Sequence, residues 1–223
     1  MKKVCTIVGA GPGISMAVAR RFAREGYTIV LIARRLEKLG RFLEELQHEG
    51  NGAFAYSADA ADFAALKRVF REIHHQINPT DVLVYNVVVP RESSPASLDA
   101  EKLVQDFRVN VAGALMAAQQ VIPHMKSQRQ GTILFTGGGL ALEPHPKYAS
   151  IAVGKAGIRN LSFSLAAELE PAGIHVATVT IAGIVRPGTS LDPERIAEEY
   201  WRLHVQPPGK FQRESLMKEE SKN

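Results

Sequence analysis

The chain has 223 residues, 45% of them hydrophobic, which is enough to bury a substantial core within one domain. Its 27 basic and 23 acidic residues give a net charge of +4, and the basic residues are spread along the chain, so a nucleic-acid partner is not indicated. No stretch approaches the roughly 20 apolar residues that cross a bilayer, and the single cysteine, Cys5, excludes an intrachain disulfide. We therefore expect a soluble cytoplasmic protein without a membrane partner.

A glycine-rich turn organises the first part of the chain. The apolar run 4–8 predicts a strand, and a helix that begins near residue 14 ends at Gly26 before a second strand at 28–32. Between the first strand and the helix lie Gly9, Gly11, Gly13 and Ile14. Glycines let the backbone turn tightly against a phosphate group, which the N–H groups and positive dipole at a helix start attract. This unit predicts a dinucleotide site; the alternative is a structural turn with nothing bound.

Two arginines, Arg34 and Arg35, follow the second predicted strand. About 20 residues past the glycines, dinucleotide folds place either an acid on the adenosine ribose or a basic group on a 2′-phosphate. A guanidinium can pair with phosphate through two hydrogen bonds, whereas an aspartate would repel it. Arg34 therefore favours NADP(H) over NAD, and it disfavours S-adenosylmethionine, which carries no phosphate. The alternative is that both arginines are solvated charges at the start of a helix.

The rest of the chain alternates between helical and strand patterns. Helices are predicted at 36–50, 63–73, 98–128, 148–170 and 192–204, and strands at 53–57, 81–89, 131–135 and 174–184. The helix at 98–128 is expected to turn Leu103, Phe107, Val111, Leu115 and Met116 inward. The helix at 148–170 is too apolar for a half-exposed helix, so we expect the sheet and another subunit to cover it, in a homodimer or homotetramer. His74 and His75, which directly follow the predicted helix at 63–73, have no partner at metal-ligand spacing, and no metal site is expected.

Strands that alternate with helices indicate an α/β protein with one doubly wound parallel sheet of the Rossmann type. We expect a single NADP-binding domain over residues 1–204, followed by a polar tail at 205–223 in which a short edge strand around 215–217 is the only candidate element. Ligands of such sheets bind outside the carboxyl ends of the strands. Asp59 and Asn86 stand there, and Asp59 could accept a hydrogen bond from the adenine amino group or cap the next helix.

With Val8-Gly9-Ala10-Gly11-Pro12-Gly13-Ile14, Asp59, Asn86, Asn110 and Lys155 in this order and spacing, the chain resembles the short-chain dehydrogenase/reductase family over residues 4 to about 185. The resemblance implies that the glycine turn and Lys155 bind the cofactor and that Val185 gives a backbone contact to the nicotinamide amide. Some motif positions differ. Ser15 replaces the last glycine, Tyr85-Asn86-Val87-Val88 stands for Asn-Asn-Ala-Gly, and Ala182-Gly183 stands for Pro-Gly.

The catalytic positions of the family differ more. Its Tyr-x-x-x-Lys reads Ile151 to Lys155, and the serine 13 positions before that tyrosine reads Gly138. In the family the tyrosine donates a proton to the carbonyl oxygen, the serine holds that oxygen, and the lysine holds the ribose and lowers the tyrosine pKa. Asn110 and Lys155 remain as candidate catalytic residues, and Tyr148 is the candidate substitute acid, although it lies seven residues before Lys155 rather than four.

Two functions follow from this pattern. The first is an NADPH-dependent oxidoreductase that acts on a carbonyl or hydroxyl substrate with a displaced or substrate-supplied proton donor. The second is a protein that binds NADP(H) without hydride transfer, as a sensor or as an inactive partner in an oligomer. The sequence names no substrate.

Overall fold

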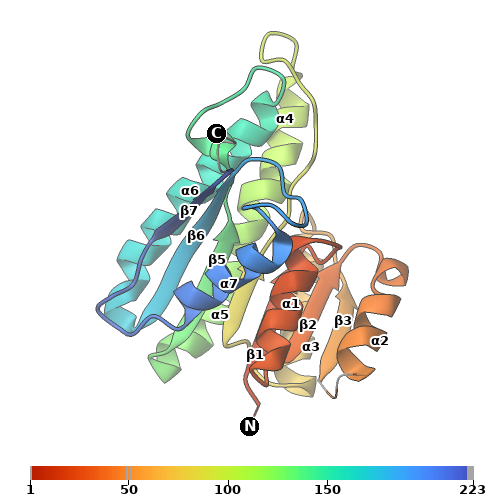
Figure 1. Cartoon of the computed structure of the whole chain (residues 1–223), viewed down its shortest axis with the longest axis vertical. Coiled ribbons are helices and arrows are strands. Elements are labelled where there is room, and N and C mark those ends of the chain that lie inside the picture. Colours follow the sequence, from red (N-terminus) through yellow and green to blue (C-terminus); the bar gives the residue numbers. More distant parts are fainter. Residues whose placement is uncertain (1, 49, 51, 220–223) are drawn as a thin grey trace.

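The computed structural model describes residues 2–48, 50 and 52–219. Its centre is a seven-stranded sheet in the order β3-β2-β1-β4-β5-β6-β7, in which every neighbouring pair is parallel. The strands are β1 (Val4–Val8), β2 (Thr28–Ala33), β3 (Ala53–Ser57), β4 (Val82–Tyr85), β5 (Gly131–Thr136), β6 (Ile174–Ala182) and β7 (Glu214–Lys218). The strand order reverses between β1 and β4, which makes the sheet doubly wound as predicted (Figure 1).

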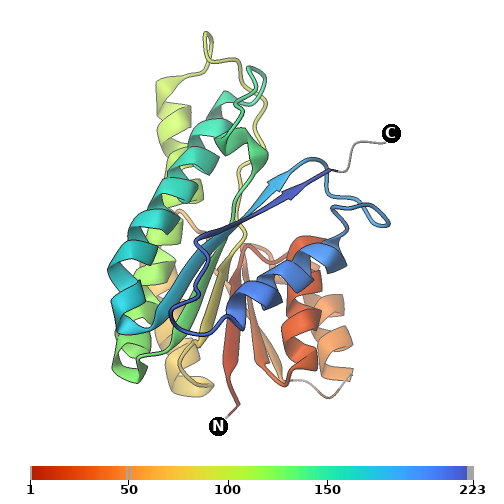
Figure 2. The ribbon, with the colours of Figure 1, turned by 60° about the vertical axis from the view of Figure 1, so that its left-hand side comes forward.

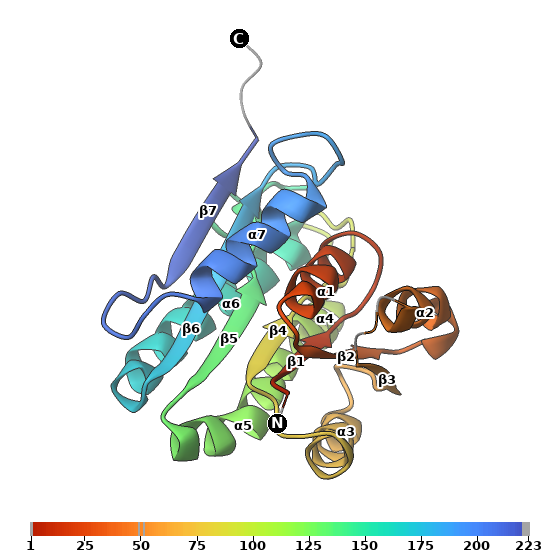
Figure 3. The ribbon, with the colours of Figure 1, turned by 60° about the horizontal axis from the view of Figure 1, so that its bottom comes forward.

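Helices cover both faces of this sheet (Figure 3). One face carries α1 (Ile14–Arg24), α2 (Gly40–His48) and α7 (Pro193–His204), and the other carries α3 (Phe63–Gln76), α5 (Gly113–Gln128) and α6 (Ala149–Leu169), with α4 (Ala100–Phe107) leading into α5. Each face has its own apolar core. Phe22, Leu46 and Tyr200 belong to the first core, and Leu66, Phe70 and Ile158 belong to the second. Burial on both faces explains why the central strands are continuous apolar runs.

The predicted helix at 98–128 is three segments rather than one. Helix α4 ends at Phe107, a π-helical turn spans Arg108–Ala112, and α5 begins at Gly113. The predicted inward face is also partly wrong, because Phe107 is 40% exposed while Asp106 is buried. The π turn carries Asn110, whose side chain is buried. Such π-helical turns are frequent at functional sites.

Several other boundaries differ from the prediction. The region 36–50 divides into a 3₁₀ turn at Leu36–Lys38 and α2, and β4 ends at Tyr85 instead of continuing to residue 89. Helix α6 begins at Ala149 with Tyr148 as its N-cap, and β6 ends at Ala182. The expected edge strand is present as β7, which pairs with β6 along its whole length and brings the polar tail into the sheet (Figure 2).

In the part of the chain that the structure describes, no helix combines the length and the apolar character that a bilayer crossing demands. The loops after β1, β2, β3 and β4 meet at one edge of the sheet, together with those after β5 and β6 (Figure 1). The candidate site residues are on these loops and on the helix starts beside them.

Candidate functional site

Two cavities open at the carboxyl edge of the sheet. The first has a volume of about 340 Å³ and is lined by Gly9, Arg34, Asp59 and Asn86, four of the residues predicted to bind a dinucleotide. These residues follow β1, β2, β3 and β4, so the cavity lies at the point where the strand order reverses. This is the place where open α/β sheets bind their ligands.

The glycine turn has the geometry that such a site needs. Gly9 has a φ of 86°, and a Cβ atom there would lie 2.6 Å from the Asn86 carbonyl oxygen, so no other residue fits. Gly13 is the N-cap of α1 with a φ of 84°, and a Cβ atom on Gly11 or Gly13 would meet nothing within 4 Å. No described side chain caps α1, and its first turn contains no acidic residue. The start of α1 therefore presents free N–H groups to a phosphate.

Ser15 ties this turn to the end of β4. The Ser15 hydroxyl donates to the Gly9 carbonyl oxygen at 3.0 Å and accepts a hydrogen bond from the Asn86 Nδ2 atom at 2.6 Å. The side chain of Ser15 is buried, so this link is shielded from water. The sequence flagged Ser15 only as a departure from a glycine, and its role as the partner of Asn86 was missed.

The basic residues after β2 differ in their placement. Arg34 is exposed, lines the first cavity and has no ion-pair partner among the described residues. Arg35 is also exposed but precedes the 3₁₀ turn at Leu36–Lys38 and does not line this cavity. An unpaired guanidinium at the cavity wall is available for a phosphate group.

Asp59 is not the cap of the next helix, so that interpretation is wrong. The N-cap of α3 is Asp62, whose carboxylate accepts a hydrogen bond from the Ala65 N–H at 3.0 Å. The Asp59 Oδ1 atom accepts from the Ala61 N–H at 2.8 Å, which fixes a turn within the loop after β3. A carboxylate in the cavity wall keeps other lone pairs free to accept from a ligand.

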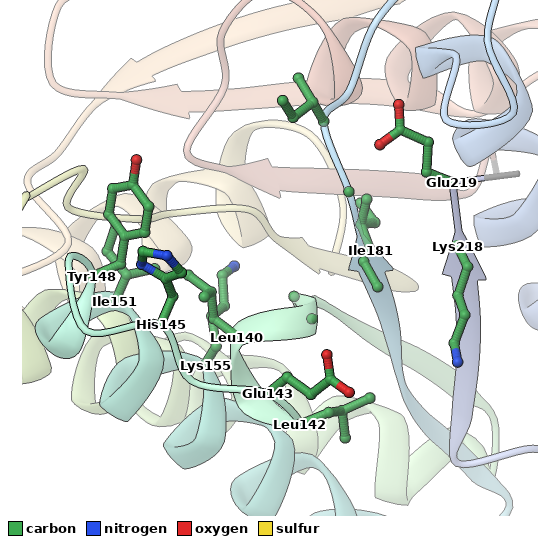
Figure 4. Close-up of a pocket in the computed structure, with 15 residues that line it drawn as sticks. Leu140, Leu142, Glu143, His145, Tyr148, Ile151, Lys155, Ile181, Lys218 and Glu219 are labelled. Carbon is green, nitrogen blue, oxygen red and sulfur yellow. The ribbon is translucent and has the colours of Figure 1, made fainter. Parts of the chain in front are cut away.

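The second cavity has a volume of about 630 Å³ and is shown in Figure 4. Its inner part is lined by Gly138, Ile151 and Lys155, and Tyr148 and His145 line it near the start of α6. Large aliphatic side chains complete the wall, together with residues from the end of β7. The cavity is of a size typical for small-molecule sites.

Lys155 is turned toward the sheet. Its Nζ atom donates to the carbonyl oxygen of Thr136 at 2.7 Å, and burial lowers the pKa of this ammonium group to about 8. The Lys155 stem packs against Gly138, where a Cβ atom would lie 3.3 Å from the Lys155 Cε atom. Without a side chain at position 138, the lysine stem lies directly on the strand end.

Asn110 lies behind Lys155 on the π turn. Its Oδ1 atom accepts a hydrogen bond from the Val89 N–H at 2.9 Å, while its buried Nδ2 atom has no partner among the described residues. Asn110, Lys155 and Ile151 line a void of about 10 Å³, close to what one water molecule needs. An unpaired buried amide beside such a void can hold a water molecule or a ligand group.

Tyr148 stands at the mouth of the cavity and not beside Lys155. Backbone hydrogen bonds hold its segment, because the Ser93 N–H donates to the Lys147 carbonyl at 2.8 Å and the Ala149 N–H donates to the Ser93 carbonyl at 3.1 Å. The rings of Tyr148 and His145 lie 5.6 Å apart, and the Tyr148 hydroxyl points away from Lys155 (Figure 4). Ile151, one helical turn before Lys155, presents an apolar side chain in its place.

An ion pair with a buried carboxylate, which the sequence did not suggest, connects the segments that carry these residues. The Asp106 carboxylate accepts two hydrogen bonds from Arg91, at 2.7 and 3.0 Å, and one from the Ser150 hydroxyl at 2.6 Å. The Arg91 guanidinium and the Ser150 hydroxyl lower the pKa of this carboxyl group. Three segments, the loop after β4, α4 and the start of α6, are thereby held together.

Some predicted site residues do not reach either cavity. Gly11, Gly13, Ile14 and Arg35 lie outside the linings, and Val185 packs against the core on the α7 face. Gly11 and Gly13 nevertheless belong to the open start of α1. Among the described residues, no three His, Cys, Asp or Glu side chains come together in a way that could hold a metal ion.

The fold and this edge are those of a nucleotide-binding α/β protein, with a second cavity beside the first. Residues 3–196 match the family model of the short chain dehydrogenases. The chain is 32% identical over 188 residues to a 2,3-dihydro-2,3-dihydroxybenzoate dehydrogenase of Bacillus subtilis (strain 168), covering 84% of this chain and 70% of that protein. It is 29% identical over 200 residues to a 3-oxoacyl-[acyl-carrier-protein] reductase of Staphylococcus aureus (strain Mu50 / ATCC 700699), covering 89% and 81%. The chain belongs to the short-chain dehydrogenase family.

Solved structures agree with this assignment. A metagenomic short-chain oxidoreductase in complex with NADP aligns with a TM-score of 0.89 and 25% identity, over 97% of this chain and 96% of that chain. An alcohol dehydrogenase from the archaeon Thermococcus sibiricus, complexed with 5-hydroxy-NADP, has a TM-score of 0.87 and 23% identity over 97% and 96%, which supports the fold. NADP in the first of these structures agrees with the cofactor that Arg34 predicts here.

Proposed function

We propose that this protein is an NADP(H)-dependent oxidoreductase that acts on a carbonyl or hydroxyl substrate without the family's tyrosine and serine. The observation that carries the proposal is the placement of two cavities at one sheet edge. The nucleotide cavity has Arg34 in its wall, and the substrate cavity has Lys155 in its wall. Val87, Val88 and Asn110 line the space between them.

The residues of the first cavity, together with the start of α1 and Lys155 of the second cavity, fit NADP(H). The open start of α1 suits the diphosphate, Arg34 suits the 2′-phosphate, and Asp59 suits the adenine amino group, while Lys155 is the candidate for the second ribose. Arg35 and Val185 remain cofactor candidates through the family resemblance alone. When bound, NADPH supplies a hydride. Ile151 and Gly138 supply neither a proton nor a hydrogen bond from their side chains, so the proton has another source, either a displaced group such as Tyr148 or the substrate itself.

A panel of ketones, aldehydes and quinones tests this proposal in one assay. We expect NADPH oxidation with at least one of the three classes, and slow or undetectable oxidation with simple ketones, because general acid catalysis typically contributes about 10²–10⁴-fold. The measurement is NADPH absorbance over time, with wild type and Tyr148→Phe side by side. Loss of turnover in Tyr148→Phe would identify a displaced acid. No oxidation with any class, despite calorimetric binding of NADPH, would sink the proposal.

A second candidate function is NADP(H) binding without hydride transfer, as a sensor or as an inactive subunit. The observation in its favour is that the Lys155 ammonium group donates to the Thr136 carbonyl and faces an apolar Ile151 instead of a phenol. A negative panel with retained NADPH affinity is the result that this candidate requires.

We also propose a homodimer or homotetramer through α4, α5 and α6. Val104 and Phe107 on α4 and Val153 on α6 are 62%, 40% and 44% exposed, and Phe107 packs beside Gly157 of α6. Exposed apolar residues that gather on neighbouring helices are typical of interaction surfaces. The double variant Val104→Glu/Val153→Glu should be monomeric by light scattering, whereas Val205→Glu, a matched change at an exposed valine after α7, should not. A monomeric wild type at micromolar concentration would contradict this proposal.

A further inference from the structure

The mouth of the substrate cavity exposes aliphatic side chains that a ligand could cover. Leu142, in the loop after the 3₁₀ turn Gly139–Ala141, is 42% exposed, and Ile184, just after β6, is 57% exposed. Leu140, Ile151 and Ile181 extend the apolar wall inward. An apolar ligand that buries these aliphatic groups, which lie on two different loops of one cavity, removes apolar surface from water, and this favours binding.

The charged side chains of this cavity balance one another. Lys155 and Lys218 contribute positive charges, and Glu143 and Glu219 contribute negative charges. Among the described residues, neither lysine forms an ion pair with either glutamate. The two positive and two negative charges nevertheless cancel over the cavity. The lining therefore favours a neutral ligand over a strongly charged one.

The inner wall offers no side-chain hydroxyl to a reacting oxygen. Gly138 and Ile151 carry none, and the Tyr148 hydroxyl points away from Lys155 (Figure 4). The Lys155 ammonium group is engaged with the Thr136 carbonyl at 2.7 Å. The positive charge of Lys155 would stabilise an oxyanion formed at this wall. No tyrosine stands at the family's position to give that oxyanion a proton.

The need for that proton depends on the substrate. Hydride addition to a simple ketone gives an alkoxide, whose basicity is comparable to that of hydroxide, and the pKa of water is about 15.7. Hydride addition to a quinone gives a phenolate-type anion, and the pKa of a phenol is about 10. The delocalised anion can form without simultaneous protonation, so the missing acid matters much less.

We infer that the substrate cavity takes planar, neutral quinones with an apolar ring body. This inference rests on the proposed oxidoreductase function and assigns its substrate class. A C–H bond of the reduced dihydronicotinamide breaks and an O–H bond forms on one quinone oxygen, so that the quinone gains two electrons and one proton, its ring becomes aromatic, and NADP⁺ remains. The product is the hydroquinone monoanion, which takes its second proton from water on release.

A comparison of two ligands of similar size tests whether reduction in this cavity depends on a proton donor. Menadione is a two-ring quinone, and 2-decalone is a two-ring saturated ketone. We expect both to bind within about tenfold of each other by calorimetry without nucleotide, because both present an apolar body to Leu142 and Ile184. NADPH oxidation should be at least 100-fold faster with menadione than with 2-decalone, after subtraction of the protein-free rate.

Variants of the cavity mouth test the binding mode independently of turnover. Leu142→Ser and Ile184→Ser should each weaken menadione binding about tenfold, whereas Val205→Ser, an exposed valine remote from the cavity, should leave it unchanged. Circular dichroism melting checks that each variant is folded, and NADPH affinity should stay constant in all of them.

Each outcome decides a different statement. Equal turnover of 2-decalone and menadione would overturn the inference while supporting the oxidoreductase, because a proton donor would then be present. Menadione binding that is insensitive to Leu142→Ser and Ile184→Ser would also overturn the inference. Turnover of neither ligand would overturn the inference, and the proposed function falls with it only when the whole panel of ketones, aldehydes and quinones also fails with NADPH bound.

Discussion

Replacing Arg34 by aspartate should invert the nucleotide preference of this protein. Arg34 is the unpaired cation in the wall of the nucleotide cavity, so NADPH should bind more tightly than NADH to the wild type. Hydrogen bonds to charged groups contribute about 1.5–3 kcal/mol each. An aspartate would remove them and repel the 2′-phosphate while accepting from the ribose hydroxyls of NADH. We expect the ratio of the two dissociation constants to change by about 100-fold or more.

Calorimetric titration of both nucleotides against wild type and Arg34→Asp measures this ratio. Arg41→Asp is the matched control. It makes the same change of charge, but Arg41 is exposed on α2 and does not line the cavity. The Arg34 effect should shrink as salt rises, since exposed charges are screened at about 8 Å in physiological salt. Wild type that binds NADH as tightly as NADPH would refute the prediction.

Restoring the family pattern at two positions should accelerate the reduction of simple ketones. The double replacement Ile151→Tyr/Gly138→Ser supplies an acid and an oxyanion donor beside Lys155 and Asn110. Together with the retained lysine, these groups should raise NADPH oxidation by at least about 100-fold. Below a pH of about 8 Lys155 is mostly charged, and that charge should lower the pKa of the new phenol.

The geometry sets the limits of this experiment. Gly138 has an extended backbone that any residue adopts, but a Cβ atom there lies 3.3 Å from Lys155 atoms, so the lysine stem must shift slightly. Ile151 is half-buried at the cavity wall, which gives the larger ring space to enter. Ile151→Phe/Gly138→Ser controls for shape without the hydroxyl. A gain in both double variants, or in neither, would mean that the site is not assembled as proposed.

The glycine turn and the apolar runs were sufficient to predict the fold. The five inner strands β1, β2, β4, β5 and β6 are buried on both faces, and each helix start or end falls near a capping residue or a glycine, so local patterns and tertiary structure agree. The meeting of Gly9, Arg34, Asp59 and Asn86 in one cavity was predictable for the same reason, because they follow four strands that a parallel sheet brings to one edge.

The π turn and the Arg91–Asp106 ion pair could not be predicted from local patterns. Helical spacing places Phe107 inward, yet Gly113, Ala114 and Ala117 occupy the buried face, and Asp106 is buried because Arg91 and Ser150 satisfy its carboxylate. The hydroxyl of Tyr85 donates to the Val109 carbonyl at 2.5 Å, a tertiary contact at the π turn. Such partners are distant in sequence, and periodicity contains no information about them.

The position of Tyr148 also depended on tertiary contacts. The sequence made Tyr148 the first residue of the predicted helix at 148–170, seven positions before Lys155, and left the direction of its side chain open. The backbone pairing between Ser93 and the segment before α6 decides the matter, because it fixes Tyr148 as the N-cap at the cavity mouth.

The Arg91–Asp106–Ser150 link has a consequence for the dynamics of the site. Opening any one of these segments alone would leave the buried Asp106 carboxylate without a partner, so the loop after β4, the end of α4 and the first turn of α6 should open as one cooperative unit. Amide hydrogen exchange in these three segments should share a single opening free energy. A nucleotide that contacts the loop after β4 would then slow exchange at the start of α6 as well, so that occupancy of one cavity rigidifies the wall of the other.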